Sequence, residues 1–565
     1  MGFTNDAHHN EPVEVACRLL AEGYRPVPTD AAGEPLVVPP SGNGEIDEGT
    51  LRAWFELAGP GAGLGLLHAD GAIEAYTPSA VAAVADDARR RRMEKTAKQK
   101  TDCGNAARLF LAHGDVLRYV PAWSTWLLWN GTHWAKDEEL AIYGLAKRVA
   151  LDVFAEALDF SKNSDEWKSA YRWAGQSSTR QRIESMISLV RPDLAATPAA
   201  LDADPWLLNC RNGTLDLKAG ELRPHRREDL ISKLAPVAYD PAATCPLWLA
   251  FLDRVMAGNE ELIAYLQRIL GMCLTADVSE QALFIFFGPG ANGKSVLLDT
   301  LTALMGDYGG EAAPDLLIVR RSDEHPTQVA DLQGRRLVVA AETEEGGRLR
   351  VSLLKRLTGN ARLKARFMCR DFFEFTRTHK LILATNSKPA VREGTHAVWR
   401  RLRLVPFDVV IPEPEQDKQL TSRLQVEWSG ILNWLVAGCL AWQAGGLQTP
   451  DEVVDATQAY EDEQDVLGEF LDECIIFASN AHAERTVVWE VYSAWAQRRR
   501  EKWPLSRTAL YANLRRRERV EDTDRQIGGR KVRVFTGFAL AAPRVPSPSP
   551  PGETCDPTTQ GDFPY

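Results

Sequence analysis

The chain has 565 residues, too many for one hydrophobic core, and its length predicts about three or four domains. Its 45% hydrophobic and 25% charged residues are ordinary for a soluble globular protein. The formal net charge of -11 excludes nucleic-acid binding through an overall positive field, so that any such contact must come from local basic patches.

The nine cysteines are scattered and form no C-x-x-C pair, which argues against a disulfide framework and a zinc ribbon. The first residues are polar and contain no apolar signal core. No apolar run approaches the roughly 18 residues that would span a bilayer. These features predict a cytoplasmic protein with reduced thiols.

The chain begins with a predicted small α/β domain, residues 1–85. An amphipathic helix ends at Gly23, a strand follows, and apolar residues return over 63–76. Residues 86–103 carry a dense run of charges, which we interpret as a charged linker or an exposed helix.

The middle of the chain predicts three successive regions. Residues 104–245 combine helices with Trp-rich strands, with hairpin turns expected at Asn130-Gly131 and Asn212-Gly213. Residues 246–280 predict a helical collar. Residues 281–411 alternate short strands and helices, which is typical of an α/β domain.

The last part of the chain predicts a helical region over 412–480, with helices over 418–447 and 457–477. Residues 481–540 are expected to form a module of their own. Residues 541–565 are rich in Pro and Ser, show no periodicity and are expected to be disordered.

The segment from Gly288 to Ser295 fits the phosphate-binding pattern G-x-x-x-x-G-K-[ST]. A buried-strand pattern precedes it and a helix pattern follows, so a chance Gly-rich turn is the weaker interpretation. Backbone N–H groups and the helix dipole would bind phosphate oxygens, Lys294 would reach the β- and γ-phosphates, and Ser295 would hold Mg²⁺. The pattern predicts ATP and Mg²⁺ as ligands. The residues expected to bind the nucleotide are Gly288, Gly290, Asn292, Gly293, Lys294 and Ser295.

Further catalytic residues are expected downstream of this loop. Glu342 and Glu344 follow an apolar strand, where a carboxylate can hold Mg²⁺ and orient water; we expect Glu342 to be the metal ligand. The alternative is an acidic surface turn. Asn386 ends another apolar strand and can contact the γ-phosphate or the attacking water, although strands also end in Asn for turn reasons.

Two adjacent arginines, Arg400 and Arg401, follow within the same compact span. An arginine that stabilises the transferring phosphoryl group is often supplied by a neighbouring subunit. A salt-bridged surface pair is the alternative. We see no second phosphate-binding loop, which argues against a two-lobed helicase, and a nucleoside kinase would not require the strand ending at Asn386 followed by paired arginines.

The order of these motifs resembles the phage and plasmid primase-helicase family, which includes the primase of a satellite phage and the poxvirus primase-helicase. The resemblance extends over about residues 104–540, and the motor is similar to a superfamily 3 helicase. It implies a ring-forming, ATP-driven DNA helicase, usually hexameric, that replicates a phage, prophage or plasmid in a bacterial or phage-infected cell. Element and host replication proteins are the further partners that it implies.

The resemblance also implies that the segment 355–370 contains a hairpin that follows single-stranded DNA through the ring channel. Its composition agrees, because cations beside phenylalanines suit phosphate contact and base stacking. A solvated basic turn is the alternative. The residues expected to bind DNA there are Lys355, Arg362, Lys364 and Arg366.

Two positions depart from the family pattern. Asn360-Ala361 stand where Gly-Asp is usual, and His396 stands where an acidic residue is usual. Neither belongs to the phosphate-binding loop, so we expect ATPase activity to be retained.

Full-length relatives often carry a primase-polymerase domain, and residues 1–85 resemble its opening. Nucleotidyl transfer needs paired carboxylates to hold two metal ions, whereas this strand offers Glu74 alone. We interpret the region as a truncated remnant and expect no primase activity. A regulatory or assembly domain is the alternative.

Basic residues outnumber acidic ones over 485–540. A helix, a second helix capped by Ser506 and a hairpin turning at Gly528-Gly529 predict a winged helix whose basic second helix reads a DNA groove. A solvated basic face is the alternative. The residues expected to bind duplex DNA there are Arg507, Arg515 and Arg516.

The predicted fold class is therefore a multidomain α/β protein with a P-loop, AAA+-like superfamily 3 helicase core, an α/β N-terminal region and a C-terminal winged helix. The leading functional hypothesis is an ATP-dependent DNA helicase. The alternatives are a DNA-binding replication initiator or loader that uses ATP for assembly, and an interference factor encoded by a mobile element.

Overall fold

The computed structural model divides the chain into two compact units. The first unit comprises Met1–Asp204, Asn212–Thr214 and Arg223–Leu234, and the second comprises Pro205–Arg211, Leu215–Leu222 and Ala235–Tyr565. The structure describes residues 26–29, 63–67, 73–76, 78–313, 316–319, 326–341, 347–368, 371–391, 396–464, 466–501, 504–515, 517 and 520–541.

Three short strands form an antiparallel sheet near the start of the first unit, in the order β1-β2-β3. They are β1 (Pro26–Thr29), β2 (Gly63–Leu67) and β3 (Ile73–Tyr76). The strand expected after Gly23 is therefore present, and Glu74 lies in β3. The helix expected before Gly23 lies outside the described residues.

The charged segment predicted as a linker or an exposed helix is helical. Helix α3 (Pro78–Ala97) covers most of it, and α4 (Asp102–His113) follows after a short break. Pairs one helical turn apart support α3, with 2.6 Å between Arg91 Nη2 and Asp87 Oδ2. Of the two interpretations, the structure thus shows the helix, and the domain boundary expected at residues 86–103 stays a prediction.

The rest of the first unit packs helices against a small antiparallel sheet of order β4-β5-β6. The predicted turn at Asn130-Gly131 joins β5 to β6, and Gly131 has φ +98°, a value that favours glycine. The elements are β4 (Leu117–Val120), β5 (Thr125–Trp129), β6 (Trp134–Lys136), α5 (Ala141–Ala157), α6 (Asp165–Ser177) and α7 (Arg180–Leu189).

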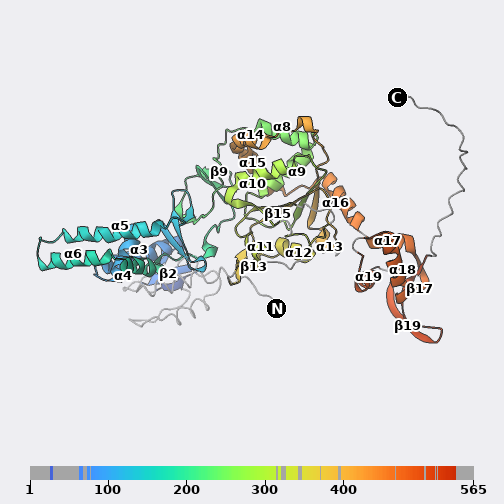
Figure 1. Cartoon of the computed structure of the whole chain (residues 1–565), viewed down its shortest axis with the longest axis horizontal. Helices are drawn as coiled ribbons and strands as arrows, with labels where there is room; N and C mark the ends of the chain where they lie inside the picture. The colour runs from blue at the N-terminus through green and yellow to red at the C-terminus, as the bar shows by residue number, and fades with distance from the viewer. Residues whose placement is uncertain are drawn as a thin grey trace, which may run out of the picture. The chain divides into compact units, whose positions relative to one another are not determined.

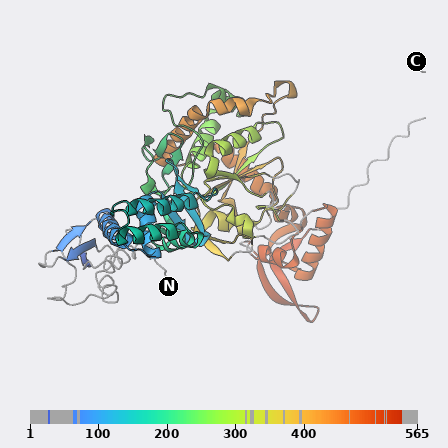
Figure 2. The same ribbon diagram turned by 60° about the vertical axis from the view of Figure 1, so that its left-hand side comes forward.

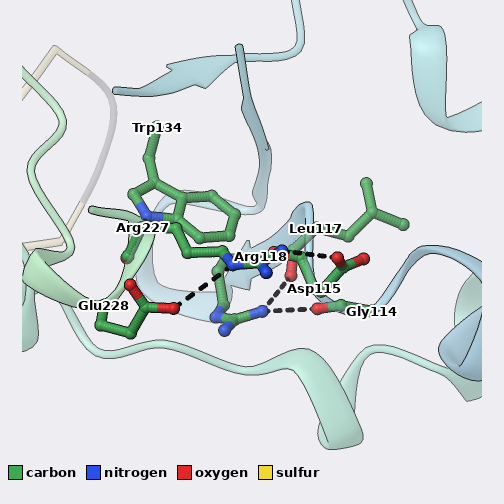
Figure 3. A network of polar contacts seen from close by, with 7 residues as sticks. All are labelled: Gly114, Asp115, Leu117, Arg118, Trp134, Arg227 and Glu228. Atoms are coloured by element: carbon green, nitrogen blue, oxygen red, sulfur yellow. Dashed lines mark hydrogen bonds and ion pairs between the residues drawn. The ribbon is translucent and has the colours of Figure 1, made fainter. Parts of the chain in front are cut away.

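A network of polar contacts in this unit joins the segment around Arg227 to the β4-β5-β6 sheet (Figure 3). The Arg118 guanidinium lies 4.7 Å from the centre of the Trp134 ring and donates to the Gly114 carbonyl at 2.6 Å. Burial lowers the pKa of Arg118. Arg227 pairs with Asp115, and its carbonyl accepts a hydrogen bond from Trp134 Nε1 at 2.8 Å. These contacts explain why the segment around Arg227 belongs to the first unit.

The second unit is built on a five-stranded parallel sheet of order β11-β12-β15-β10-β16. The α/β pattern predicted for 281–411 is thus observed. The strands are β10 (Leu283–Phe287), β11 (Gly309–Glu311), β12 (Leu337–Ala341), β15 (Lys380–Thr385) and β16 (Leu402–Pro406).

Both faces of this sheet are buried. Along β10, Phe284 and Phe286 enter one hydrophobic cluster while Leu283 and Ile285 enter another, because successive side chains of a strand point to opposite faces. Figure 1 shows α8, α9, α10 and α15 on one face and α11, α12 and α13 on the other. Burial on both faces explains the uninterrupted apolar run of β10.

The helices around the sheet agree with the predicted helical regions. The expected collar forms α8 and α9, and the helices expected over 418–447 are α14 and α15. These helices are α8 (Pro246–Val255), α9 (Glu260–Met272), α10 (Lys294–Met305), α11 (Pro326–Ala330), α12 (Val351–Gly359), α13 (His396–Trp399), α14 (Leu420–Val426), α15 (Trp428–Gly445) and α16 (Asp451–Gln464).

A two-stranded antiparallel hairpin follows α12. Strands β13 (Arg362–Ala365) and β14 (Phe373–Thr376) pair with Leu363 opposite Phe375. The hairpin expected over 355–370 is therefore displaced along the chain, because residues up to Gly359 continue α12 instead.

The C-terminal module has its own hydrophobic cluster, which includes Phe470, Tyr492 and Phe538. Its sheet has the order β17-β19-β18, and the hairpin turn falls at Gly528 and Gly529, both at positive φ. Figure 2 shows this hairpin, in red, projecting from its helices. The elements are α17 (Val466–Cys474), β17 (Ile475–Glu484), α18 (Arg485–Arg498), α19 (Arg507–Leu514), β18 (Glu521–Ile527) and β19 (Arg530–Leu540).

Two helices and a hairpin are present here as predicted, but the module is larger than expected. The helix predicted over 457–477 ends at Cys474, and β17 begins at Ile475. Helix α17 shares the module's hydrophobic cluster through Leu467 and Phe470. The boundary expected at residue 481 therefore lies too late in the chain.

The remaining regular elements are short. The turn predicted at Asn212-Gly213 is formed by Arg211 and Asn212, and Gly213 begins β8; β7 and β8 are neighbours in a sheet of order β7-β8-β9. These strands are β7 (Leu207–Cys210), β8 (Gly213–Asp216) and β9 (Glu221–Arg223). Single 3-10 turns occur at Pro121–Trp123, Pro192–Leu194, Pro198–Ala200, Arg227–Asp229, Gly306–Tyr308 and Glu413–Glu415.

Candidate nucleotide site and nucleic-acid surfaces

The predicted phosphate-binding loop joins the end of β10 to the start of α10. A Cβ atom at Gly288 would lie 2.1 Å from the Phe407 carbonyl oxygen, so this position admits only glycine without movement of the backbone. Gly293 has φ +83°, and a Cβ there would lie 2.6 Å from Val255 Cγ1. A Cβ at Gly290 would meet nothing within 4 Å. Two of the three glycines are therefore required by close packing under the loop.

Lys294 is the most constrained polar side chain of this loop. The residue is only 5% exposed, and its ammonium donates to the Gly288 carbonyl at 2.8 Å and to Asn292 Oδ1 at 3.0 Å. Burial lowers the pKa of Lys294 to about 8. The ammonium is thus surrounded by neutral oxygens and is prepared to interact with a more strongly negative group.

Asn292 ties the loop to a neighbouring strand. Its amide Nδ2 donates to the Phe407 carbonyl at 2.9 Å, directly after β16, while Oδ1 accepts from Lys294. The residue is 3% exposed. Asn292 therefore acts through its neighbours by holding the loop and the ammonium in place.

Asn386 meets the loop from the adjacent strand β15. Lys294 Nζ donates to Asn386 Oδ1 at 3.0 Å, although 92 positions separate the two residues. The pairing of Phe287 with Thr385 explains this approach, since the carboxyl ends of β10 and β15 lie side by side. The structure thus brings together two residues that the sequence placed in one site.

The strand that precedes the predicted acidic residues is also correctly positioned. Ala341, the last residue of β12, pairs with Ala384 on β15. Glu342 and Glu344 themselves lie outside the described residues, and Ser295 is exposed in the first turn of α10. The carboxyl ends of β12, β15 and β10 therefore share one edge of the sheet.

The two adjacent arginines have different environments. Arg401 is 8% exposed and donates to Gln281 Oε1 at 3.2 Å and to the Ala397 carbonyl at 2.5 Å. Burial, followed by the charge of Arg400, lowers the pKa of Arg401. Arg400 is exposed. Of the two, the exposed side chain of Arg400 is better placed to reach another subunit.

The predicted DNA-binding residues of the 355–370 segment divide between two elements. Lys355 lies on α12, whereas Arg362, Lys364 and Arg366 lie on or just after β13 and are exposed. The charges of Lys364 and Arg366 lie 5.3 and 5.0 Å from the centre of the Phe372 ring. Phe372 is 52% exposed. Cations and an exposed aromatic ring therefore lie together near the hairpin tip.

In the C-terminal module, Arg507 begins α19 and Arg515 follows its last turn, and both are exposed. Ser506 caps the helix by accepting from the Ala509 N–H at 3.3 Å, as predicted. Arg516 lies outside the described residues. The two described arginines thus lie at opposite ends of the short helix.

Several residues that contribute to these sites were not predicted from the sequence. The Phe407 carbonyl anchors Asn292, and a main-chain acceptor leaves no signal in a sequence. Asp522, Arg485 and Arg533 form a cluster in the C-terminal module. Pairing the strands about Gly528-Gly529 would have placed Arg533 near the acidic residues of β18.

These features define a multidomain α/β protein with a parallel sheet, in which a glycine-rich loop joins β10 to α10. The family model described as D5 N terminal like matches residues 106–257, and a family of unknown function (DUF5906) matches residues 286–401. A protein of Acanthamoeba polyphaga mimivirus, provisionally named a helicase, is 25% identical over 303 residues, which are 50% of this chain and 32% of the relative.

Other relatives are also viral. A protein of Invertebrate iridescent virus 3, provisionally named a helicase, is 25% identical over 50% of this chain and 33% of its own length. An African swine fever virus protein, provisionally named a primase, is 26% identical over 36% of this chain and 22% of its own length. The chain thus matches about a third or less of the length of these curated relatives.

Among solved structures, the C-terminal region of NrS-1 aligns with a TM-score of 0.44 and 12% identity, over 74% of this chain and 95% of that one. The family model and the viral relatives confirm the predicted relationship to the phage and viral primase-helicase family. Within the part of the chain that the structure describes, no helix combines the length and apolarity needed to cross a membrane.

Proposed function

We propose that the protein is an ATP-dependent DNA helicase of the superfamily 3 type that acts in replication of a phage, prophage or plasmid. The single observation that carries this proposal is the hydrogen bond between Lys294 and Asn386. It joins the phosphate-binding loop to a polar residue on the adjacent strand, where the reacting phosphate of a bound nucleotide would lie. The viral relatives provisionally named helicases support the same function.

The residues of the loop fit a nucleoside triphosphate. The glycine backbone lies too close to Phe407 and Val255 for a side chain, and the N–H groups at the start of α10 are suited to phosphate oxygens. On binding, the Lys294 ammonium would exchange neutral carbonyl partners for phosphate. That exchange would favour the protonated lysine, whose pKa burial lowers to about 8 in the free protein.

Mg²⁺ would be held by Ser295 and Glu342, and it would neutralise charge on the β- and γ-phosphates. Asn386 would orient the attacking water, and Glu342 and Glu344 would supply the carboxylates near it. Arg400 would contact the nucleotide of a neighbouring subunit, because a residue that completes a site from outside must be exposed. This arrangement requires an oligomer, and the family resemblance favours a hexamer.

The β13-β14 hairpin would contact single-stranded DNA. Lys364 and Arg366 can bind phosphates, and the half-exposed Phe372 ring beside them can stack on a base. Movement of the hairpin during hydrolysis would then pull the strand. The C-terminal module, which we interpret as a winged helix, would bind duplex DNA. The absence of primase activity remains a prediction.

The test is DNA-stimulated ATP hydrolysis by the full chain. Lys294→Ala should remove hydrolysis with and without DNA, because it removes the charge that contacts the phosphates. Lys364→Ala should retain basal hydrolysis and lose the stimulation by single-stranded DNA. Lys418→Ala, at an exposed lysine outside the hairpin, is the matched control and should behave as the wild type. ATP hydrolysis that survives in Lys294→Ala would refute the proposed site.

The second candidate is a replication initiator or loader that recognises duplex DNA and uses ATP for assembly. The cluster of arginines in the C-terminal module favours it, since that module could bind the duplex DNA of a replication origin without the motor. Footprinting on origin DNA separates the two functions. Protection of one sequence without unwinding of a forked duplex would support the initiator.

A further inference from the structure

A pocket of about 360 Å³ lies in the C-terminal module, between the start of α18, α19 and strand β19. Its lining includes four arginines and two threonines. These residues are Arg485, Thr486, Arg507, Thr508, Arg515 and Arg533. They come from three separate elements. The cations therefore meet because of the fold, and not because they are adjacent in the sequence.

A buried carboxylate orients three of the four arginines. Asp522 is 7% exposed at its side chain and accepts from Arg515 Nε at 2.7 Å and from Arg533 Nε at 3.3 Å. Arg485 Nη1 lies 3.6 Å from its Oδ2 atom. Each guanidinium has five N–H donors, so contact with one carboxylate leaves others for a ligand. Asp524 Oδ1 also lies 3.8 Å from Arg533 Nε. Four positive charges against these two carboxylates leave the cluster cationic.

Tyr511 fixes the remaining geometry. Arg507 Nε donates to the Tyr511 hydroxyl at 3.0 Å, and the Arg485 guanidinium lies 4.3 Å from the centre of the tyrosine ring. The tyrosine is only 4% exposed. It supports the arginines but offers no free face on which a base could stack.

We propose that this pocket binds a backbone phosphate of duplex DNA, and that α19 therefore positions the duplex without reading its sequence. The inference rests on the proposed function and names the chemistry of its duplex contact. Arginine forks match phosphate geometry, and hydroxyls of the two threonines add donors. Arg507 and Arg515 were expected to read a groove, but both line the pocket. Contacts to phosphate set position and carry no base information directly.

Duplex DNA is favoured over a free nucleotide because the charged side chains are accessible. Arg515 and Arg533 are 47% and 58% exposed at their side chains, which suits an extended ligand passing over the surface. A free nucleotide would gain little from its base here, since the Tyr511 ring is covered. Its phosphate would use the same donors, so the experiment must distinguish the two sources.

The experiment measures binding of the full chain, without ATP, to two labelled duplexes of equal length and unrelated sequence. Arg533→Ala should weaken both complexes by about tenfold and reduce the slope of log K against log salt by about 0.9. Arg530→Ala removes the same charge from an exposed position on the same strand, outside the pocket lining, and should change affinity by less than about twofold.

A second variant separates orientation from charge. Asp522→Asn removes a negative charge, so a diffuse field predicts tighter DNA binding. If Asp522 orients the arginines, the same variant should bind about threefold to tenfold more weakly. Glu521→Gln removes the same charge from the preceding, exposed position on the same strand; it is the matched control and should not weaken binding. Unchanged ATP hydrolysis and unchanged thermal unfolding would show that both variants are folded.

Four results would overturn the proposal. Equal losses in Arg530→Ala and Arg533→Ala would indicate a diffuse surface, and tighter binding by Asp522→Asn would remove the orienting role. A tenfold preference for one duplex sequence would indicate base reading. The nucleotide arm measures AMP binding to a chain that carries Lys294→Ala. If adding Arg533→Ala abolishes this binding and leaves duplex affinity unchanged, the pocket belongs to a free nucleotide. Because these assays need no ATP turnover, failure here is distinct from failure of the motor.

Discussion

The nucleotide site and the C-terminal pocket are both suited to phosphate, but they are built in opposite ways. In the loop, one lysine is buried among neutral oxygens and glycines bring the backbone close. In the pocket, several exposed arginines are oriented by one acidic residue. A buried, preformed site favours one ligand geometry, whereas exposed charges favour adjustable and salt-sensitive contact. The difference suits a catalytic site on one hand and an anchor on the other.

The largest expected effect concerns an arginine that a neighbouring subunit would supply to the nucleotide site. Arg400→Ala should lower kcat by roughly 10³-fold or more with little change in nucleotide affinity, if its charge stabilises the phosphoryl transition state. Arg401→Ala should instead lower the free energy of unfolding by about 1–3 kcal/mol, because its buried hydrogen bonds are lost. Steady-state kinetics and denaturant unfolding of both variants measure the contrast. Equal kinetic losses would show that exposure does not distinguish the two arginines.

A smaller effect is expected at the hydrogen bond between Lys294 and Asn386. Asn386→Ala should lower kcat by about 10²-fold, since it removes a polar group aligned with Lys294 at the reacting phosphate. Ser387→Ala changes the next residue and serves as the control. Single-turnover hydrolysis separates the chemical step from product release. A wild-type rate in Asn386→Ala would remove that residue from catalysis.

The comparison also predicts different responses to pH. The pKa of Lys294 is lowered to about 8 in the free protein, and a bound triphosphate should raise it. ATP binding should therefore be strongest below pH 8 and weaken by up to about tenfold per pH unit above it, with proton uptake on binding. Duplex binding should change little, because arginines stay charged.

Isothermal titration with a non-hydrolysable ATP analogue between pH 7 and 9.5 measures the first response. Lys294→Arg keeps a positive charge throughout this range and is the control that should lose the pH dependence. ATP affinity that stays constant up to pH 9.5 in the wild type would contradict the lowered pKa.

The smallest effect is expected at a helix cap. Ser506→Ala should destabilise the C-terminal module by about 1 kcal/mol, because the Ala509 N–H loses its acceptor. The nucleotide site should be unaffected, which would show that the two regions are stabilised separately. Denaturant unfolding followed by tryptophan fluorescence, with Ser493→Ala as a second serine substitution in the module, measures this difference. A parallel loss of ATPase activity would show that the regions are coupled.

The nucleotide site could be predicted from sequence because its residues follow strand ends. Apolar runs identify β10 and β15, and parallel pairing brings Lys294 and Asn386 together. The anchor at Phe407 was not predictable, since a backbone carbonyl leaves no residue-specific signal.

Other features depended on three-dimensional pairing. The basic hairpin was predicted too early because α12 extends to Gly359, and charge alone does not distinguish a helix end from a strand. Arg507 and Arg515 were found from composition, but Arg485 and Asp522 join them only through the packing of α18 against the β18-β19 hairpin.

The most direct test of the account is unwinding of a forked DNA duplex by the full chain. The account predicts unwinding by the wild type only with ATP and Mg²⁺, and none by Lys294→Ala. Lys364→Ala should hydrolyse ATP and bind duplex without unwinding it, whereas Arg533→Ala should recover the wild-type rate at saturating protein. Unwinding that proceeds in Lys294→Ala, or ATP hydrolysis by the wild type that never separates the strands, would contradict the account.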